Sequence, residues 1–454
     1  MDYKNKKVLI LGLGFNEGGV GSAKFFAGEG ADVLVTDLKT ENELAQSLEK
    51  LKTYPGIKYH LGGHKYEDID WADIVVRNQA VPPSNPYLKH AIESGKKIET
   101  DIGIFLSFVN HKNIIGITGT KGKSTTTSLI YEVLKASGKK VIISGNIGKS
   151  VLDLLSHIQD DTLIVLEISS FQLESFDSKK VSPKYAVITN IYPDHLNYYN
   201  SMADYVAAKK LIAKHQTNED FLFINKFDKE TSNDKFLSDL KSEIIFYQPS
   251  DLPPDFKPVI SGEHNLSNIA AAFAVSKVLK ISEEDALKTL ENFQGVEFRQ
   301  QLVKDWNGIK IYNNTTATAP EPAIESLKTF PNCILICGGM NKGLDYKKFA
   351  ESIETYAKDV YFLAGDATDE IISLLKNRPS SVTKHHKPYK SFYDILEMIK
   401  KNSKPGDTIL LSPGATSFNL FQNEFDRGRK FNEAVEQVFA PEVIKVSKDT
   451  TITR

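Results

Sequence analysis

The sequence predicts an α/β protein whose parallel, doubly wound sheets are divided among three units. Short apolar strands alternate with helical segments along most of its 454 residues, which is the pattern of βαβ units. The first strand of each of the first two units runs into a glycine-rich turn, as strands do where a helix N-terminus receives phosphate groups. The length corresponds to about three domains at roughly 150 residues each. Ligands of such sheets lie at the carboxyl ends of the strands, so we expect the functional residues there.

Composition and charge restrict the possible partners. A hydrophobic content of 41% with 25% charged residues indicates a large folded core rather than disorder. The formal net charge of −2 provides no overall attraction for nucleic acid or for an anionic membrane. The N-terminal residues contain no apolar signal-peptide core, and no apolar run approaches the ~20 residues of a membrane span. We therefore expect a cytoplasmic protein without a nucleic-acid or membrane partner, in which local groups hold any anionic ligand. We also expect a monomer.

The first unit opens with a buried-strand pattern at residues 7–11 that ends in Gly12-Leu-Gly14. A helix-like stretch and a second strand at residues 32–37 complete a βαβ pattern. Further strand candidates at residues 74–76 and 98–100 extend it into a small parallel sheet.

The turn after the first strand is similar to a dinucleotide-binding fingerprint. Gly12, Gly14 and, further along, Asp37 stand where the phosphate-binding glycines and the ribose-binding acid of that fingerprint fall. Glu17 occupies the position of the third glycine and would repel a pyrophosphate placed as in dehydrogenases. The sequence therefore favours a nucleoside diphosphate over a nicotinamide cofactor at this helix N-terminus. A glycine-rich turn without a ligand is the structural alternative.

The second unit begins with an apolar strand at residues 114–118, which leads into Gly119-Thr-Lys-Gly-Lys-Ser124 and then into a helical pattern. The two glycines allow successive backbone N–H groups to point toward a phosphate. Lys123 has the reach for the β- and γ-phosphates of a nucleotide, and Ser124 presents a hydroxyl to Mg²⁺. The strict phosphate-loop pattern would place a glycine at Ile117, so a glycine-rich surface loop is the alternative.

Polar side chains follow two further strands of this unit. Glu167 ends a strand at residues 163–167 beside a Ser-Ser-Phe-Gln turn, and Asp194 and His195 follow a strand at residues 185–189. A carboxylate at the edge of the sheet that carries a phosphate loop is a natural Mg²⁺ ligand. The alternative is a serine-capped helix with a solvated glutamate and a structural histidine.

Other segments complete the second unit. Strand candidates stand at residues 141–143 and 221–225. The proline-rich run at residues 248–258 predicts an irregular excursion before a helix at about residues 264–279. Two alanines precede Lys209 on a helical segment, which would let this lysine turn inward.

The third unit has two glycine-rich turns that follow apolar strands. Its strand candidates stand at residues 309–312, 333–337, 360–363 and 408–411. The turns after the second and the fourth of these strands supply Lys342, Thr416 and Ser417. An ammonium group and hydroxyls suit a small substrate that carries carboxylates.

Both cysteines, Cys333 and Cys337, fall on one of these strands. Residues four apart on an extended strand are too distant for a disulfide, and two thiols make no metal site. We expect both cysteines in the core.

Taken together, these motifs resemble the Mur ligase family, and most closely its glutamate-adding members. The likeness runs in matching order to about residue 438. Its most specific pieces are Thr118-Gly-Thr-Lys-Gly-Lys-Ser-Thr125, Ser144-Gly-Asn-Ile-Gly148, Glu167-Ile-Ser-Ser-Phe-Gln-Leu-Glu174, Asp194-His195, the segment from Tyr205 to Lys209, Gly262-Glu-His-Asn-Leu-Ser-Asn268 and the segment from Ser412 to Gly428. The resemblance implies a UDP-binding Rossmann-like domain at residues 1–107, a central P-loop-type ATP-binding domain at residues 108–296 and a Rossmann-like amino-acid-binding domain at residues 297–454.

The resemblance also implies a reaction. Family members of this kind use ATP and Mg²⁺ to join glutamate to UDP-N-acetylmuramoyl-L-alanine through an acyl phosphate, in peptidoglycan precursor synthesis. We expect D-glutamate, and a branch of the family that adds L-glutamate is the alternative. A small-molecule kinase would share the phosphate loop but would not need the third unit. A non-catalytic UDP-sugar-binding protein is the alternative outside enzymes.

Site residues are carried over from the family onto matching positions. The catalytic set is Lys123, Glu167, His195, Lys209 and Asn146. The ATP-binding set is Gly119, Thr120, Lys121, Gly122, Lys123, Ser124, Thr125, Asn268, Arg299 and Asn314. The UDP-sugar set is Gly14, Phe15, Asn16, Asp37 and Asn78, and the glutamate set is Thr318, Lys342, Ser417 and Phe425. The metal set is Ser124, Glu167, His195 and Lys209, with Lys209 carbamylated as in the family.

Several positions depart from the family pattern. The usual Asp-Ser-Lys-Ala-Thr-Asn is Asn314-Thr-Thr-Ala-Thr-Ala319 here, so that Asn314 replaces an aspartate and Thr316 replaces a lysine. The usual His-Arg is Phe298-Arg299. Arg77-Asn-Gln-Ala-Val-Pro82 stands in place of a Ser-Pro-Gly turn, and Glu424 replaces an aromatic residue. The residues for phosphate chemistry are thus retained, while the departures concern the two outer domains.

Overall fold

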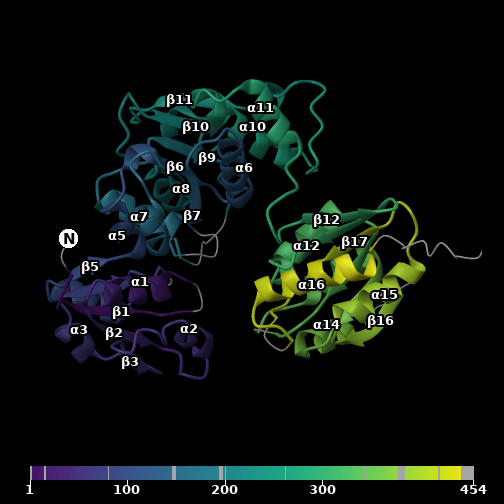
Figure 1. Ribbon diagram of the computed structural model, residues 1–454, viewed down its shortest axis with the longest axis horizontal. Helices are drawn as coiled ribbons and strands as arrows, with labels where there is room; N and C mark the ends of the chain where they lie inside the picture. Colours follow the sequence, from purple (N-terminus) through teal and green to yellow (C-terminus); the bar gives the residue numbers. More distant parts are fainter. Residues whose placement is uncertain are drawn as a thin grey trace, which may run out of the picture. The chain divides into compact units, whose positions relative to one another are not determined.

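Two compact units make up the protein, residues 1–293 and residues 294–454. The computed structural model, shown in Figure 1, describes residues 3–14, 17–79, 81–145, 150–193, 198–199, 201–260, 262–341, 343–376, 384–417 and 420–440. The first unit contains two parallel sheets, and the second contains one mixed sheet. The predicted α/β class with parallel sheets is confirmed.

The first sheet has the strand order β3-β2-β1-β4-β5, with every neighbouring pair parallel. Its strands are β1 (Lys7–Leu11), β2 (Asp32–Asp37), β3 (Lys58–Leu61), β4 (Ile74–Arg77) and β5 (Lys97–Glu99). The helices between and after them are α1 (Glu17–Gly28), α2 (Ala45–Glu49), α3 (Tyr66–Trp71), α4 (Pro86–Glu93) and α5 (Asp101–Leu106). Central β1 is apolar and buried over most of its length, because parallel strands covered by helices face the core on both sides.

The second sheet has the order β11-β10-β9-β6-β8-β7 and is also parallel. Its strands are β6 (Ile114–Thr118), β7 (Val141–Gly145), β8 (Leu163–Glu167), β9 (Tyr185–Ile188), β10 (Phe221–Asn225) and β11 (Glu243–Tyr247). Its helices are α6 (Lys123–Ala136), α7 (Ser170–Ser178), α8 (Met202–Lys210), α9 (Asp234–Leu237), α10 (Glu263–Val278) and α11 (Glu283–Glu291), with short 3₁₀ turns at His111–Asn113, Leu152–His157 and Pro249–Asp251. The helix predicted at about residues 264–279 is therefore confirmed as α10.

The sheet of the second unit has the order β12-β13-β17-β14-β15-β16, and only the β12–β13 pair is antiparallel. Its strands are β12 (Gln301–Trp306), β13 (Ile309–Asn313), β14 (Cys333–Cys337), β15 (Ala357–Leu363), β16 (Lys384–Tyr389) and β17 (Thr408–Leu411). Its helices are α12 (Pro320–Thr329), α13 (Lys347–Tyr356), α14 (Asp366–Lys376), α15 (Phe392–Asn402) and α16 (Glu424–Val438). Cys333 and Cys337 are both buried, as expected, and burial raises the pKa of the Cys333 thiol to about 12.

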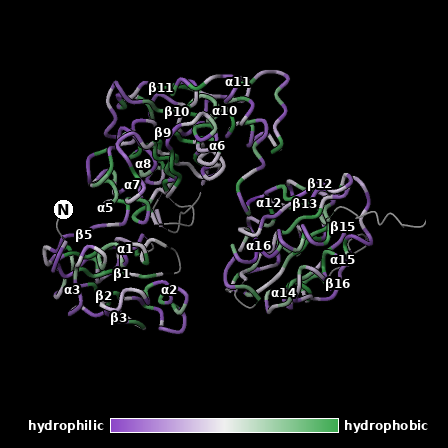
Figure 2. Tube along the Cα trace, viewed as in Figure 1, coloured by the Kyte–Doolittle hydropathy of each residue, from purple (hydrophilic) through white to green (hydrophobic). Residues whose placement is uncertain are grey.

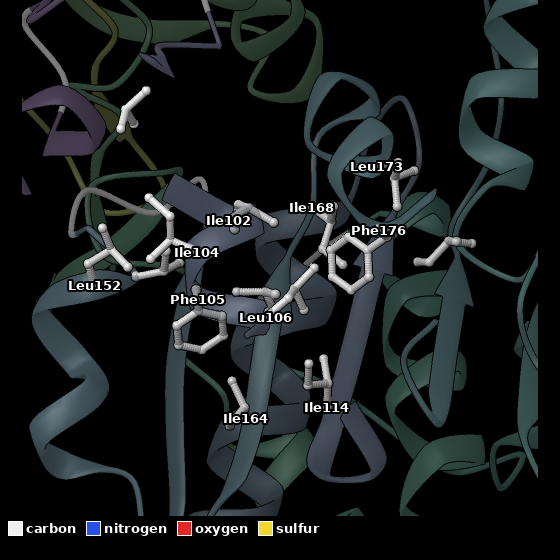
Figure 3. Close-up of a cluster of buried hydrophobic side chains, with 14 of the residues drawn as sticks. Ile102, Ile104, Phe105, Leu106, Ile114, Leu152, Ile164, Ile168, Leu173 and Phe176 are labelled. Atoms are coloured by element: carbon white, nitrogen blue, oxygen red, sulfur yellow. The ribbon is translucent and has the colours of Figure 1, made fainter. Parts of the chain in front are cut away.

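The two sheets of the first unit share a hydrophobic core. Short α5 lies between them (Figure 1) and is buried along most of its length. Figure 3 shows its side chains Ile102, Ile104 and Phe105 packed in the same cluster as Ile164 and Phe176 of the second sheet region. Figure 2 shows hydrophobic residues concentrated along the strands and hydrophilic residues along peripheral loops. No helix among the described residues is long and apolar enough to cross a membrane.

The sequence pattern missed only edge strands. Within the described residues, the strands without a candidate in the sequence are β3, β11, β12 and β16, and each lies at an edge of its sheet. An edge strand pairs on one side and is partly exposed, so it lacks the continuous apolar run of a central strand. The exposed and half-buried pattern of β16, Lys-His-His-Lys-Pro-Tyr, illustrates this.

Polar pairs connect α7 to the first sheet within the first unit. Arg77, at the end of β4, donates from Nη2 to Oε2 of Glu174 at 3.1 Å. Lys179 donates to buried Glu99 at 3.0 Å, and the hydroxyls of Thr100 and Ser175 lie 2.7 Å apart. These contacts fix the helix that follows β8 against the carboxyl edge of the neighbouring sheet.

We predict that Arg77→Met lowers the free energy of unfolding by about 1 kcal/mol, because it removes a charge-assisted hydrogen bond of a side chain that is only 11% exposed. The partial exposure of Glu174 weakens this hydrogen bond and keeps the expected loss small. The shift of the urea midpoint measures this. Lys140→Met is the matched control, since its pair with Asp161 is 59% and 65% exposed and should contribute less than ~0.5 kcal/mol. Equal shifts for both variants would contradict the prediction.

Candidate active site

The predicted phosphate loop connects β6 to α6. Gly119 has φ +144° and Gly122 has φ +86°, both in the region that favours glycine. A Cβ on Gly119 would lie 1.9 Å from Thr189 Oγ1, and one on Gly122 would lie 2.3 Å from Asn268 Oδ1. A side chain at either position would therefore displace Thr189 or Asn268, because the segments after β9 and near the start of α10 lie directly against the loop.

The segment after β9 holds the loop by hydrogen bonds. Thr120 N donates to Asn190 O at 2.8 Å, and Lys121 N donates to Asn190 Oδ1 at 2.9 Å. Thr189 Oγ1 and Asn190 Nδ2 both donate to Lys121 O, at 2.6 and 2.9 Å. Thr120 and Lys121, two of the residues predicted to bind ATP, are thus held in place by their backbone.

Two lysines converge on one carbonyl oxygen of the loop. Lys123 Nζ donates to Gly119 O at 2.9 Å and to Thr120 O at 3.0 Å. Lys209 Nζ, from α8, donates to the same Gly119 O at 2.9 Å and lies 4.7 Å from the centre of the Tyr205 ring. Lys209 is only 1% exposed, so the predicted inward turn of this lysine is confirmed. Two cationic groups therefore lie beside the place where the loop would hold phosphates.

Glu167 and Ser124 provide oxygen atoms at the same edge of the sheet. Glu167 ends β8, where it is paired in register with Ile117 of the strand that leads into the loop. Both Glu167 and Ser124, in the first turn of α6, are buried. Among the described residues no group of three or more His, Cys, Asp or Glu side chains forms a metal cluster. One carboxylate and one hydroxyl fit Mg²⁺, which keeps several waters and binds substrate phosphates.

Other residues predicted for this site have different placements. Asn268 is buried and accepts a hydrogen bond from Thr126 at 3.3 Å. Thr125 lies in the first turn of α6. Asn146 and His195 lie outside the described residues.

Three of the predicted UDP-sugar residues, Gly14, Asp37 and Asn78, meet at the glycine turn between β1 and α1. Asp37 Oδ2 accepts a hydrogen bond from Gly14 N, and its Oδ1 accepts one from Lys39 N, both at 2.9 Å. Asn78 Nδ2, after β4, donates to Gly12 O at 3.1 Å. The carboxylate of Asp37 therefore holds the turn itself, and a contact to a ribose stays a prediction. Phe15 and Asn16 lie outside the described residues.

Three loops of the second unit meet at the carboxyl ends of neighbouring strands β13, β17 and β14. Gly414 N donates to Ala317 O at 2.9 Å, and Met340 N and Thr416 N donate to each other's carbonyl oxygens at 3.0 and 3.1 Å. Ser417 follows directly, and its buried Oγ has no hydrogen-bond partner among the described residues. This brings together the loops that carry the predicted glutamate-binding residues Thr318 and Ser417. Thr318 is half-buried, Phe425 is 39% exposed, and Lys342 lies outside the described residues.

A buried arginine that the sequence analysis did not single out joins two of these loops. Arg427 of α16 is fully buried and donates to Thr315 Oγ1, Thr315 O and Ala415 O at 2.8, 2.8 and 3.0 Å. Burial lowers the pKa of its guanidinium. The signal in the sequence was helical spacing, because Arg427 falls on the stripe that continues with Phe431, Val435 and Val438.

The remaining ATP-binding residues, Arg299 and Asn314, belong to the second unit. Arg299 is exposed in the turn before β12, and Asn314 is buried directly after β13. Asn314 Nδ2 donates to Ser326 Oγ at 2.5 Å. The side-chain amide of Asn314 thus links the end of β13 to α12.

The parallel sheets and the phosphate loop define a nucleotide-binding α/β protein. The model of the Mur ligase middle domain matches residues 117–252, and that of the MurD-like N-terminal domain of Mur ligases matches residues 6–100. The UDP-N-acetylmuramoylalanine–D-glutamate ligase of Borreliella afzelii is 37% identical over 463 residues, which cover 96% of this chain and 99% of that protein. The enzyme of the same name from Clostridioides difficile is 33% identical, covering 96% and 100%. The chain belongs to the Mur ligase family.

Solved structures show the same fold. The UDP-N-acetylmuramate-alanine ligase MurC of Thermotoga maritima superposes with a TM-score of 0.57 at 21% identity, covering 95% of this chain and 100% of that one. The MurF ligase of the same organism, in complex with ADP, gives a TM-score of 0.52 at 15% identity, covering 96% of each chain. The three-domain Mur ligase architecture expected from the sequence agrees with these likenesses.

We predict that Lys123→Ala leaves the fold intact and lowers turnover at least ~10²-fold, because a preorganised cation beside the transferred phosphoryl group is lost. Phosphate release from ATP in the presence of UDP-N-acetylmuramoyl-L-alanine and glutamate measures the effect. Lys135→Ala, which removes an exposed lysine from the last turn of the same helix, is the matched control and should retain activity. Near-normal phosphate release by a folded Lys123→Ala protein would contradict the assignment.

Proposed function

We propose that the protein catalyses the ATP-dependent addition of D-glutamate to UDP-N-acetylmuramoyl-L-alanine, a step of peptidoglycan precursor synthesis. The observation that carries this proposal is the phosphate loop on which Lys123 and Lys209 converge at Gly119 O. The full-length likeness to ligases named for this reaction supports the choice of substrates. The domain assignment is that of the family: UDP-sugar at residues 1–107, ATP at 108–296 and glutamate at 297–454.

In the proposed mechanism the carboxylate of the L-alanyl group attacks the γ-phosphate of ATP and releases ADP. The resulting acyl phosphate is attacked by the amine of glutamate, and phosphate leaves through a tetrahedral intermediate. Lys123 and Arg299 offset the negative charge that develops on the transferred phosphoryl group. The N–H groups of the glycine-rich loop orient the phosphates. Asn146 orients the acyl group, and Asn268 contacts the adenine.

Mg²⁺ would be held by Ser124 and Glu167, and a second ion by His195 and carbamylated Lys209. Bound Mg²⁺ would supply positive charge that reduces the repulsion between the phosphates and the attacking carboxylate. Glu167 is suited to this role by its place at the end of β8, directly beside the strand that leads into the phosphate loop. Carbamylation would convert Lys209 from a cation into a carboxylate at a position that is already within hydrogen-bonding distance of the loop.

For glutamate, we propose that Lys342 pairs with one carboxylate while Thr318 and Ser417 donate hydroxyl hydrogen bonds to the other. The buried Oγ of Ser417, for which the described part of the chain offers no hydrogen-bond partner, supports a polar ligand there. Phe425 would cover the apolar part of the amino acid. Gly14, Asp37 and Asn78, with Phe15 and Asn16, would hold the UDP-sugar. The protein would act as a cytoplasmic monomer without a nucleic-acid or membrane partner.

The alternatives are weaker on specific grounds. A small-molecule kinase would use the phosphate loop but leaves the three joined loops of the second unit without a role. A UDP-sugar-binding protein without activity would not require Lys123, Glu167 and Lys209 at the edge of one sheet.

We predict that Lys209 carries a carbamate, detectable as one added CO₂ by native mass spectrometry or in an experimental density map. Lys209→Ala should abolish turnover, and high formate or acetate should restore part of it, since a free carboxylate can take the place of the carbamate as an oxygen ligand. Lys210→Ala is the matched control, because that neighbouring lysine forms a surface ion pair with Asp239. Full activity of Lys209→Ala without added carboxylate would reject the carbamate.

We predict at least ~10-fold more product with D-glutamate than with L-glutamate at equal concentration. A site with paired polar contacts leaves a buried charge without its partner when the wrong enantiomer binds, at a cost of roughly 1–3 kcal/mol. Coupled phosphate release and mass detection of the UDP-linked product measure both reactions. A preference for L-glutamate would assign the protein to the other branch, and no product with either would reject glutamate as the substrate.

A further inference from the structure

The turn that carries Arg299 has an unusual backbone on both sides of the arginine. Phe298 has φ +64° and Gln300 has φ +49°. Such left-handed conformations are unfavourable for residues with a Cβ, and they persist only where surrounding contacts hold them. Arg299 itself is exposed. The strained backbone therefore fixes the point from which the exposed Arg299 side chain projects.

Thr316 holds the first strained residue. Its Oγ1 donates to Phe298 O at 2.9 Å, and its backbone N donates to the same oxygen at 3.3 Å. The Phe298 ring is buried, and a Cβ on Gly428 of α16 would lie 2.5 Å from it. The ring and the carbonyl of Phe298 are thus both fixed, one by α16 and the other by Thr316.

Asn314 holds the second strained residue. Its Oδ1 accepts a hydrogen bond from Gln300 N at 3.2 Å, while its Nδ2 donates to Ser326 Oγ at 2.5 Å. The hydrogen of Ser326 Oγ is already donated to Pro322 O at 2.8 Å. An aspartate at position 314 would lose the Nδ2 donor, and the Ser326 hydroxyl would have to turn away from Pro322 O to keep a hydrogen bond with it.

We propose that Asn314 and Thr316 are positioning residues for Arg299 and that they act with Phe298 as one coupled set. These are three of the positions at which the sequence departs from the pattern of the family, and the structure brings them into contact around a single turn. Restoring the usual residue at one of them breaks a contact of the set instead of improving the site. The inference rests on the proposed function, in which Arg299 contacts the phosphates of ATP.

Hydrogen exchange on the full-length protein tests the positioning without any use of activity. Thr316→Val should accelerate exchange of the amides of residues 298–301 at least about 3-fold, because the side-chain hydrogen bond to Phe298 O is lost. Thr316→Ser keeps the hydroxyl and should retain protection. Thr329→Val, which removes an exposed hydroxyl that donates to Glu325 O, is the matched control. Unchanged protection in a folded Thr316→Val protein would overturn the proposal.

A double-mutant cycle then tests whether the set acts through Arg299. Thr316→Val and Asn314→Asp should each lower kcat/KM for ATP at least about 5-fold, since small displacements of a charge-stabilising group are costly, and should leave KM for glutamate within 2-fold. In an Arg299→Ala background neither change should lower kcat/KM for ATP further. The same loss in both backgrounds, or an increase with Asn314→Asp, would overturn the proposal. A wild-type protein that forms no glutamyl product would reject the proposed function and leave the exchange result standing.

Discussion

The close approach of three chain segments at one edge of the second sheet is the constraint on which the candidate site depends. Gly119 lies against Thr189, and Gly122 lies against Asn268, with no room for a Cβ at either glycine. This packing turns the loop carbonyl of Gly119 toward Lys123 and Lys209, which come from different helices. The loop is therefore not an independent motif. Its shape is set by residues about 70 and 145 positions away, and these must be in place before phosphate can be bound in a fixed geometry.

The two sheets of the first unit are joined by a shared core and by polar contacts. Buried α5 packs in the same cluster as side chains of the second sheet, and the Arg77–Glu174 and Lys179–Glu99 pairs fix α7 alongside. Since α7 directly follows β8, the helix that borders Glu167 is fixed against the sheet that carries the glycine turn of β1. These contacts link the parts of the first unit on which the ATP site and the UDP-sugar site are proposed.

The second unit buries a charged side chain, that of Arg427. Among the residues that the structure describes, Arg427 has no carboxylate as a hydrogen-bond partner, and it donates instead to oxygen atoms of Thr315 and Ala415. Burying an ion is unfavourable unless its donors are satisfied. The arrangement makes the two loops dependent on each other, because movement of either one would leave a guanidinium donor unsatisfied. The same two loops carry Thr318 and Ser417. The hydrogen bonds of buried Arg427 therefore also hold the loops of the proposed amino-acid site in place.

The sequence by itself determined the central strands, the glycine turns and the polar residues at strand ends, because each depends on a local pattern of burial or backbone freedom that a few neighbouring residues specify. It also indicated the family, and with it Lys123, Glu167 and Lys209. Only the tertiary structure decided the edge strands, whose pairing on one side leaves a weak pattern. Only the tertiary structure also showed that two lysines meet at Gly119 O and that Asp37 holds its own turn. The same is true of the burial of Arg427 and of the contacts that Asn314 and Thr316 make with the Arg299 turn. Each of these joins residues that are far apart in the chain, and sheet order and side-chain packing, not local sequence, bring them within hydrogen-bonding distance.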